Sequence, residues 1–485
     1  MSPPSKPLRI LLYVAATLVG LFVLAAIAVA VLVDGNTLKP RVEQAASDAF
    51  RMQVMIDGPM KVGIFGGAHI DAENVHIRNR DTELTFLKEV QLNFHLLPLL
   101  RGEIRYGAII TKGARIYIER DKDGVYNYFR PPPPGGTKPV DLPKVTFADM
   151  TFVYADKKTG SEIESSPCEG VLHDMKHPGG APLLKRLSVN GDFSCKEIHN
   201  KTKSASDLKF TVAATDGVFD FKPLTMQAYG GQGTGTVHMD RSGEVPTLEV
   251  QYKLAKFHVE QYFKPKKSGR AVSGLMDFST TLTMRGRTRD DLRSSATGEM
   301  TLSGNGLTLH GMDLDKELPK FASSQDFNLV DLGALLIAGP VGLVATKGYE
   351  FTTLAQPPSG TTPIRTVLST WKVEKGVAYA KDVALSTPEN RLALKGGLDF
   401  VHNEYQDVVI ALVDEQGCEK VRQKISGPFN KPVPDKTSLL IPVGPILKLI
   451  DKARTLVNQK TTCEPFYTGS LPAPKAAEKV AGAIH

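Results

Sequence analysis

The sequence predicts a mainly β protein: an N-terminal transmembrane helix, then an elongated, twisted antiparallel β-sheet body that is groove-like and carries a few short helices. Three observations lead to this fold class. A run of 24 residues that begins at Ile10 and ends at Val33 contains no charge. Beyond it, apolar residues recur at every second position, the period of a strand with one apolar face. Gly and Pro are frequent, with 43 and 32 of 485 residues, which favours many turns.

The apolar run at the N-terminus is long enough to cross a membrane. At about 1.5 Å rise per residue, a helix of this length spans the roughly 30 Å hydrocarbon core. Lys6 and Arg9 precede it and Asp34 follows, so the positive flank stays cytoplasmic and the body lies across the membrane. A cleaved signal peptide is the alternative, because Ala28-Val29-Ala30 resembles a cleavage site. We expect a retained anchor, because the run exceeds the usual apolar length of a signal peptide.

The first element after the anchor is predicted to be a short amphipathic helix over 36–50, with Leu38, Val42 and Ala46 at helical spacing. The pattern then changes to period two. Three strands are expected over 90–96, 104–110 and 114–118, joined by short turns into an antiparallel meander. Their alternating apolar residues include Val90, Leu92, Phe94, Leu96, Ile104, Ile110, Ile116 and Ile118.

Two turn signals follow these strands. The sequence Asp121-Lys122-Asp123-Gly124 resembles the start of a calcium-binding loop, but the twelve-residue ligand pattern of such a loop and its final Glu are missing. A hairpin in which Gly124 supplies a positive φ is therefore favoured. The four prolines at 131–134 cannot pair in a central strand and indicate a linker, with a docking site for an aromatic-grooved partner as the alternative.

Further strands are expected along the rest of the chain, over 275–284, 298–309, 366–373, 377–385, 391–400 and 406–413. The apolar segment 327–344 interrupts them and is interpreted as a buried or lipid-contacting pair of short helices. An amphipathic helix is predicted from Pro445, and a disordered tail over 470–485.

The predicted segments are the cytoplasmic stub 1–9, the anchor 10–33, a first β region 34–130, the linker 131–143, a middle β region 144–262, a third β region 263–432 and the C-terminal helix and tail 433–485.

The four cysteines fit an oxidising compartment, where an even count predicts two disulfides. Three pairings are open, and we favour the nearest neighbours, Cys168 with Cys195 and Cys418 with Cys463. A metal site is the alternative at Cys168, because His173 and His177 have the spacing of one helical face. Pro178 follows at once, so these histidines are expected in an exposed loop.

The glycine-rich stretch 228–240, AYGGQGTGTVHMD, raises the question of a phosphate loop. Strand-period residues stand on both sides and no helix follows, so nothing orients backbone amides at a phosphate. We interpret these glycines as bulges or points of close backbone approach in a curved sheet.

No catalytic constellation, metal motif or cofactor motif is found. The sequence contains no Gly-x-Ser-x-Gly, His-Glu-x-x-His or phosphate-loop motif. The net charge of +7 is spread without a dense basic stripe, which argues against nucleic-acid binding. We expect a protein that is not an enzyme. An exported polysaccharide-active enzyme with two distant carboxylates is the remaining catalytic alternative.

Two groups of motifs stand toward the two ends of the chain. The first group is LKEVQLNF over 87–94, PLLRGEI over 98–104, GARI over 113–116 and RDKDGVYN over 120–127, and it resembles the N-terminal region of the AsmA family. Thr362-Pro363, TWKVEKGVAYAKDVALSTP over 370–388, LKGGLDF over 394–400 and ISGPFNKP over 425–432 resemble its C-terminal end. The middle part between Cys168 and Cys195 carries no such resemblance.

The resemblance implies a single-pass protein of the bacterial inner membrane with a cytoplasmic N-terminus and a periplasmic β-rich body. It also implies a role in phospholipid transport and outer-membrane biogenesis, with phospholipid as the partner and the alternating apolar residues named above as candidate lipid-facing residues. A non-catalytic assembly or scaffolding factor for outer-membrane proteins is the alternative. A closed sandwich core has the same period as a lined groove, so the sequence leaves both open, and the resemblance favours the groove.

Overall fold

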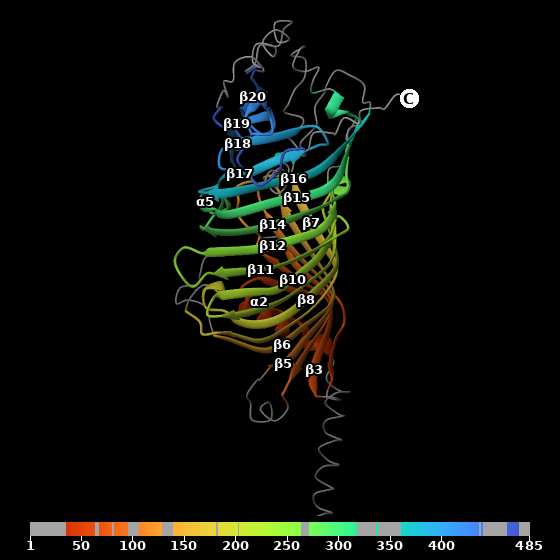
Figure 1. Cartoon of the computed structure of the whole chain (residues 1–485). Coiled ribbons are helices and arrows are strands. Elements are labelled where there is room, and N and C mark those ends of the chain that lie inside the picture. Colours follow the sequence, from red (N-terminus) through yellow and green to blue (C-terminus); the bar gives the residue numbers. More distant parts are fainter. Residues whose placement is uncertain are drawn as a thin grey trace, which may run out of the picture. The chain divides into compact units, whose positions relative to one another are not determined.

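The computed structural model describes residues 35–63, 67–79, 82–95, 106–128, 139–180, 183–201, 203–262, 271–316, 318, 336–337, 360–435, 438–439 and 463–474. These residues are mainly strands with a few short helices, which confirms the predicted class (Figure 1). They divide into two compact units, Met1–Phe221 and Lys222–His485, named unit 1 and unit 2. The division falls inside the predicted middle region 144–262, and the predicted segments stay predictions.

Several predicted features lie outside the described residues: the stub 1–9, the anchor 10–33, the prolines 131–134 and the helix from Pro445. The predicted tail is described only at 470–474, where it forms neither helix nor strand. Of the helices that the structure describes, none combines the length and apolar character needed to cross a bilayer. The anchor therefore stays a prediction.

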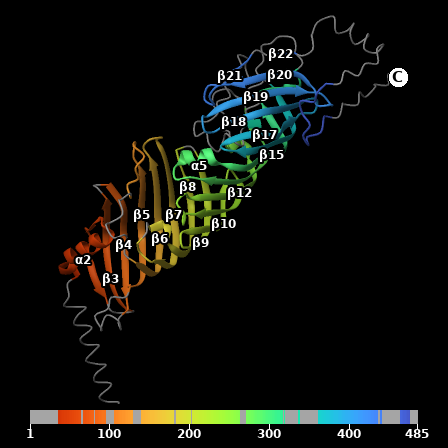
Figure 2. The ribbon, with the colours of Figure 1, turned by 90° about the vertical axis from the view of Figure 1, so that its left-hand side faces the viewer.

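The described part of unit 1 begins with a helix and continues as a twisted sheet (Figures 1 and 2). Both β1 and β2 pair with β3, and the sheet then runs in chain order from β3 to β9. The helix α2 confirms the predicted amphipathic helix. The elements are α2 (Gly35–Phe50), β1 (Gln53–Ile56), β2 (Met60–Gly63), β3 (Ala68–Asn79), β4 (Thr82–Phe94), β5 (Tyr106–Arg120), β6 (Val140–Asp156), β7 (Ser161–His177), η1 (Leu183–Lys185), β8 (Ser188–His199), β9 (Ser204–Thr215) and β10 (Val218–Ala228), whose last residues belong to unit 2.

The prediction of a purely antiparallel sheet is wrong at one pair. The strands β5 and β6 are parallel, with Ile109 opposite Val145 and Ile116 opposite Phe152. Parallel neighbours need a connection that returns the chain to the starting end of the sheet. In the chain, residues 121–139 separate the two strands, and of these the structure describes 121–128 and 139.

The predicted meander is also wrong in detail, because the expected strands 104–110 and 114–118 are one strand, β5. Gly113 lies inside it with φ 64°, a left-handed conformation that glycine adopts without strain. The glycine therefore interrupts the alternation of the strand without ending it.

Unit 2 is antiparallel in all of its described strand pairs, and its strands confirm the ranges expected from period two. Its elements are β11 (Gly231–Asp240), β12 (Thr247–His258), α4 (Val259–Tyr262), β13 (Ala271–Ser273), β14 (Leu275–Arg285), α5 (Arg289–Ser295), β15 (Thr297–His310), β16 (Thr361–Glu374), β17 (Val377–Ser386), β18 (Arg391–Asp399), β19 (Glu404–Val413), β20 (Glu419–Ser426), β21 (Val433–Pro434) and β22 (Ser438–Leu439).

The glycine-rich stretch forms a turn and a strand, in agreement with the interpretation of close approach. Tyr229 and Gly230 both have positive φ, 53° and 74°, and join β10 to β11. On β11, added Cβ atoms at Gly233 and Gly235 would meet the ring of Tyr252, in the second case 3.0 Å from its Cδ2. The ring of Tyr252 thus covers a strip of bare backbone, as aromatic residues do beside strand glycines.

Candidate functional site

Strand register defines which residues of unit 1 share a face of the sheet. Leu92 is opposite Ile70 on β3 and opposite Ile109 on β5, whereas Gln91 is opposite Asp71 and Ile110. Directly opposite residues point to the same side. Ile109 and Ile110 therefore lie on opposite faces of the sheet.

Left-handed residues interrupt the alternation in the middle of several strands. Asn74 on β3, Gly113 on β5, Asp149 on β6 and Asp207 on β9 have φ between 52° and 64°. Asn, Asp and Gly are the residues that tolerate this conformation best. On β6, for example, the residues of one face have odd numbers before Asp149 and even numbers after it. Phe147 is opposite Gly170 on β7, and Phe152 is opposite Ser165, a β7 residue on the same face as Gly170.

With these interruptions included, one face of unit 1 is apolar from β3 to β9, and we name it the apolar face. Most of its large side chains are only half-buried. Register and packing assign to it Ile70, Ala72, Val75 and Ile77; Leu87, Val90, Leu92 and Phe94; Ile109, Ala114, Ile116 and Ile118; Val145, Phe147, Met150, Phe152 and Tyr154; Ile163, Cys168 and Leu172; Phe193, Cys195 and Ile198; and Ala205, Leu208, Phe210 and Val212.

A row of aromatic rings crosses this face. Phe193 stacks on Phe210 with ring centroids 5.3 Å apart, and Phe210 contacts Phe221 edge-on at 5.8 Å. Phe147 lies 6.4 Å from Phe193 on the other side. Between them, a Cβ added at Gly170 would come within 2.5 Å of the Phe193 ring, so the glycine leaves room for it. All four rings are half-buried.

A disulfide is part of the same face. Cys168 on β7 is directly opposite Cys195 on β8, with Cα atoms 4.0 Å apart, and the two are bonded. They pack with Ala114 and Met150 in one buried cluster. The predicted pairing is confirmed, and Cys168 is therefore not a metal ligand. The disulfide cross-links adjacent strands at the centre of the apolar face.

The two histidines of the metal alternative lie on strand β7, not in the expected exposed loop. His173 pairs with Asp174 at 2.8 Å and its side chain is 43% exposed. His177 is buried, and its Nδ1 accepts the amide of Gly179 at 2.9 Å. The loop prediction is wrong because the strand continues to His177, where pairing with Val140 on β6 holds it in the sheet.

The opposite face of unit 1 is polar and mixed in charge. On β3 it presents His69 and His76, which lie 3.6 Å from Asp71 and 3.1 Å from Glu83. On β5 it presents Ile110, which is 39% exposed. The two faces of the sheet thus differ in chemistry, and the apolar face is the distinctive one.

The helix α2 covers the first strands of the apolar face. Its Leu38, Val42 and Ala46 pack on the buried cluster that contains Ala72 and Val75. Its polar side chains occupy the outer edge of β1 and β2: Asn36, Glu43 and Ser47 accept the amides of Met60, Ile56 and Val54 at 3.2, 2.6 and 2.9 Å. This edge therefore has no free amides at these positions for another strand to pair with.

The motif 120–127, which carries part of the resemblance noted above, ends β5 and starts the return to β6. Gly124 has φ 90°, the positive value expected, and Asp121 accepts the amide of Val125 at 2.8 Å. Asn127 donates to the carbonyl of Tyr117 at 2.7 Å and accepts the amide of Glu119 at 3.0 Å. Its residues therefore act in chain reversal.

The Arg120 side chain of this motif donates to the buried carboxylate of Asp156 at 3.3 Å. Burial alone would raise the pKa of Asp156, but amide hydrogen bonds from Thr159 and Lys158, together with Arg120, hold it below its ordinary value. The pair joins the ends of the parallel strands β5 and β6.

The corresponding apolar side chains of unit 2 are enclosed in a core. Trp371 and Val367 of β16 have no exposed surface, and Leu385 of β17 is 1% exposed. Leu336 and Ile337, the described residues of the apolar segment 327–344, belong to the same core at 0% and 1%. They are helical and buried, as one of the two interpretations of that segment expected.

Hydrogen bonds hold the residues that fill this core. The carbonyl of Leu336 accepts from Ser369 Oγ at 2.5 Å, and Ser369 Oγ in turn accepts from the indole of Trp371 at 2.6 Å. Asp315 accepts from Thr387 and Asn390 at 2.5 and 2.6 Å. Leu314 and Leu318, at 0% and 1% exposure, complete the filling.

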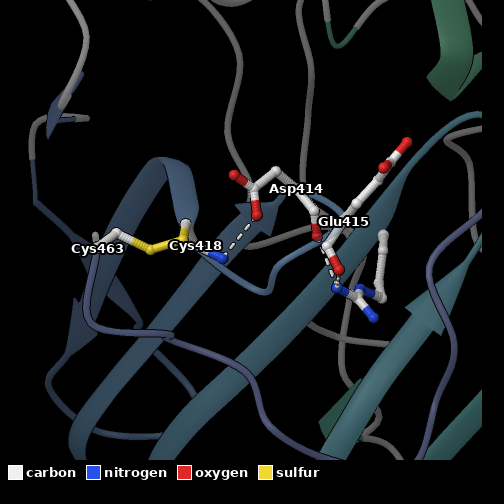
Figure 3. Close-up of a disulfide and its surroundings, with 5 residues drawn as sticks. Asp414, Glu415, Cys418 and Cys463 are labelled. Atoms are coloured by element: carbon white, nitrogen blue, oxygen red, sulfur yellow. Dashed lines mark hydrogen bonds between the residues drawn. A yellow bond between two sulfur atoms is a disulfide. The ribbon is translucent and has the colours of Figure 1, made fainter. Parts of the chain in front are cut away.

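A C-terminal segment, residues 463–474, packs on the other side of β17–β19. Cys463 is bonded to Cys418, which confirms the second predicted pair, and Asp414 accepts the amide of Cys418 at 2.8 Å (Figure 3). The ring of Tyr467 lies on a row of small residues, and its hydroxyl donates to Asp382 at 2.6 Å. The small residues are Ala384, Ala393 and Ala411, opposite one another on three strands.

Among the described residues, one group has the arrangement of a cation site: Asp399, His402 and Glu404, in the turn between β18 and β19. The Asp399 carboxylate already accepts the amide of Val401 and the ring nitrogen of His402, both at 2.8 Å. The first bond is that of an Asx turn and the second joins two side chains across the same turn, so the turn itself accounts for the group.

The structure places six of the eight candidate lipid-facing residues. Five of them lie on the apolar face: Val90, Leu92, Phe94, Ile116 and Ile118. Ile110 lies on the polar face, and Ile109 occupies the position on the apolar face that was expected for Ile110. Leu96 and Ile104 are outside the described residues. Lipid contact itself stays a prediction. Sequence reasoning missed the part of the face on β6–β9, for which the aromatic residues Phe147, Phe193 and Phe210 were the available signal.

Comparison with known proteins gives one finding. A model of the AsmA family matches residues 5–129 and 156–346, together more than half of the chain. The match includes the N-terminal motifs and the region around Cys168, for which no resemblance was expected, but not the C-terminal stretch 362–432. No similar curated protein and no similar solved structure was found.

Proposed function

Because this chain belongs to the AsmA family, we propose that it is an inner-membrane-anchored periplasmic protein that shields phospholipid acyl chains along an apolar sheet face. In this role it supports lipid transport and outer-membrane biogenesis and needs no catalytic residue, since no covalent bond changes. The single observation that carries the proposal is the apolar face of unit 1, whose aromatic row Phe147, Phe193 and Phe210 is half-buried.

The energetics of lipid transfer explain why such a face is useful. Exposing an acyl chain to water costs about 0.8 kcal/mol per CH₂, so a sixteen-carbon chain faces about 12 kcal/mol. A strand face supplies apolar side chains continuously from one strand to the next, while the lipid headgroup stays in water. Large exposed apolar patches on a protein surface mark an interaction site rather than an ordinary solvated surface.

The test uses two adjacent residues of one type. A photo-crosslinking amino acid is placed at Ile109 or at Ile110 of the full chain, in a Gram-negative bacterium, and the adducts are analysed by mass spectrometry after ultraviolet exposure. We expect phospholipid adducts at position 109 and few at position 110, because the register places them on opposite faces. Equal lipid recovery at both positions, or none at 109, contradicts the proposal.

The alternative of a protein-assembly factor predicts protein adducts in the same experiment. Such a factor could bind a partner strand along a free sheet edge. At β1 this is prevented, because Glu43 and Ser47 of α2 accept the amides of Ile56 and Val54. A stoichiometric protein adduct at either position, without lipid, would favour the alternative.

A further inference from the structure

The two units offer acyl chains very different surfaces. We propose that acyl chains occupy the apolar face of unit 1 between β5 and β9 and are excluded from the enclosed core of unit 2. This inference rests on the proposed function and adds the part of the chain that holds the lipid. Unit 1 is then the lipid-holding part, and unit 2 is a packed body.

The chemistry of the apolar face favours an alkyl chain over a peptide as its occupant. From β5 to β9 the residues that register assigns to this face carry no charge except for Arg120 and Asp156, which pair with each other at the ends of β5 and β6. Two of its hydroxyl groups have contacts within the sheet: Thr111 donates to the carbonyl of Thr146 at 3.3 Å, and Ser165 Oγ lies 3.5 Å from the disulfide sulfur of Cys168. A peptide would bring backbone amides that find no partner there, whereas an acyl chain brings none.

The dimensions of the face also suit an acyl chain. Neighbouring strands are about 4.8 Å apart, so the four spacings from β5 to β9 give about 19 Å. One leaflet of a bilayer contributes half of the roughly 30 Å hydrocarbon core, or about 15 Å. A single chain therefore fits across these strands.

The limits of this surface follow from packing inside each unit. In unit 1, Leu38 and Val42 of α2 cover the face at its first strands. In unit 2, Leu314, Leu336 and Ile337 fill the core at 0–1% exposure. The hydrogen bond from Ser369 to Leu336 would have to break before an acyl chain could enter.

The single tryptophan of the chain makes this inference measurable. Trp371 lies in the core of unit 2 with no exposed surface. The full chain is reconstituted in vesicles of phosphatidylethanolamine with or without bromine on the acyl chains, because bromine quenches indole fluorescence at contact. We expect Trp371 to keep its emission in the brominated vesicles.

Two further proteins carry the probe on unit 1. In a Trp371→Phe background, Phe193→Trp places it on the apolar face, and Tyr117→Trp places it on the polar face of β5 as the matched control. We expect Phe193→Trp to lose most of its emission and Tyr117→Trp to lose little. If Trp371→Phe does not fold, the same substitutions are made with Trp371 retained, and the additional quenched emission is compared.

The outcomes separate the inference from the function on which it rests. Quenching of Trp371 as strong as that of Phe193→Trp overturns the restriction to unit 1 and leaves lipid binding standing. Absence of quenching at both positions overturns lipid binding as well. Equal quenching of Phe193→Trp and Tyr117→Trp also overturns the inference, because it shows contact without preference for the apolar face.

Discussion

Unit 1 and unit 2 are built from the same kind of alternating strand but differ in what covers their apolar residues. In unit 1, Phe193 and Phe210 are half-buried on a face that the described residues leave open from β5 to β9. In unit 2, Trp371 and Leu392 have no exposed surface, because Leu314, Leu336 and Ile337 pack into the same core. Period two thus predicts an apolar face without predicting whether that face is a core or a binding surface.

The largest expected effect tests whether unit 2 is a packed core. Leu336→Ala and Ile337→Ala should each lower the free energy of unfolding by about 2–5 kcal/mol, because truncating a fully buried side chain leaves a cavity. Phe193→Ala in unit 1 should cost less, about 1–2 kcal/mol, since its ring already contacts water. Denaturant unfolding, followed by Trp371 fluorescence and by circular dichroism, measures the loss of unfolding free energy in the unit 2 variants and in Phe193→Ala. Equal costs would show that the two faces are equally covered.

The next largest difference is expected between the disulfide of unit 2 and the disulfide of unit 1. Replacing Cys418 and Cys463 by Ser should cost about 2–4 kcal/mol, because the bond closes a separation of 45 residues and holds the segment 463–474 on unit 2. Hydrogen exchange of that segment should rise. Replacing Cys168 and Cys195 is the matched control: the strands stay paired by their ladder, so exchange in β7 and β8 should change little. Faster exchange in β7–β8 than in 463–474 would contradict this assignment.

A pair of glycines tests whether the open face can adjust where a core cannot. Gly396→Ala in unit 2 should cost about 1–3 kcal/mol, because φ is 111° and the added Cβ would meet the backbone of Val408 at 2.6 Å. Gly170→Ala in unit 1 would first meet the ring of Phe193, a half-buried side chain that moves more easily than backbone, and should cost less than about 1 kcal/mol. Thermal denaturation gives both values. A larger cost at Gly170 would indicate a rigid, covered face.

The smallest effect depends on pH and concerns Asp156 in unit 1. Its folded pKa is lowered, so the ionised carboxylate stabilises the protein above the ordinary pKa of about 3.9, and this contribution is lost as pH falls through the lower folded value. Asp156→Asn should therefore lower stability by about 1–2 kcal/mol at pH 7. The difference should shrink below pH 4. Urea titrations at both pH values measure it, and a constant difference would show that charge is not involved.

Much of the architecture could be predicted from the sequence, because alternation and helical spacing are local properties. The helix α2, most strand ranges of unit 2 and both disulfide pairs are confirmed. The candidate site was predicted less well. Ile110 was expected beside Ile116, but Gly113 shifts the alternation between them, so Ile109 shares the face of Ile116 instead.

The sequence by itself determined that this protein consists of strands with one apolar face, because successive side chains of a strand must point to opposite sides. It did not determine which side each half of a strand presents, because one left-handed residue such as Asn74 or Asp149 reverses the alternation. Nor did it determine which face stays open. That depends on residues far apart in the chain, such as Leu336 and Ser369, whose contact only the tertiary structure creates.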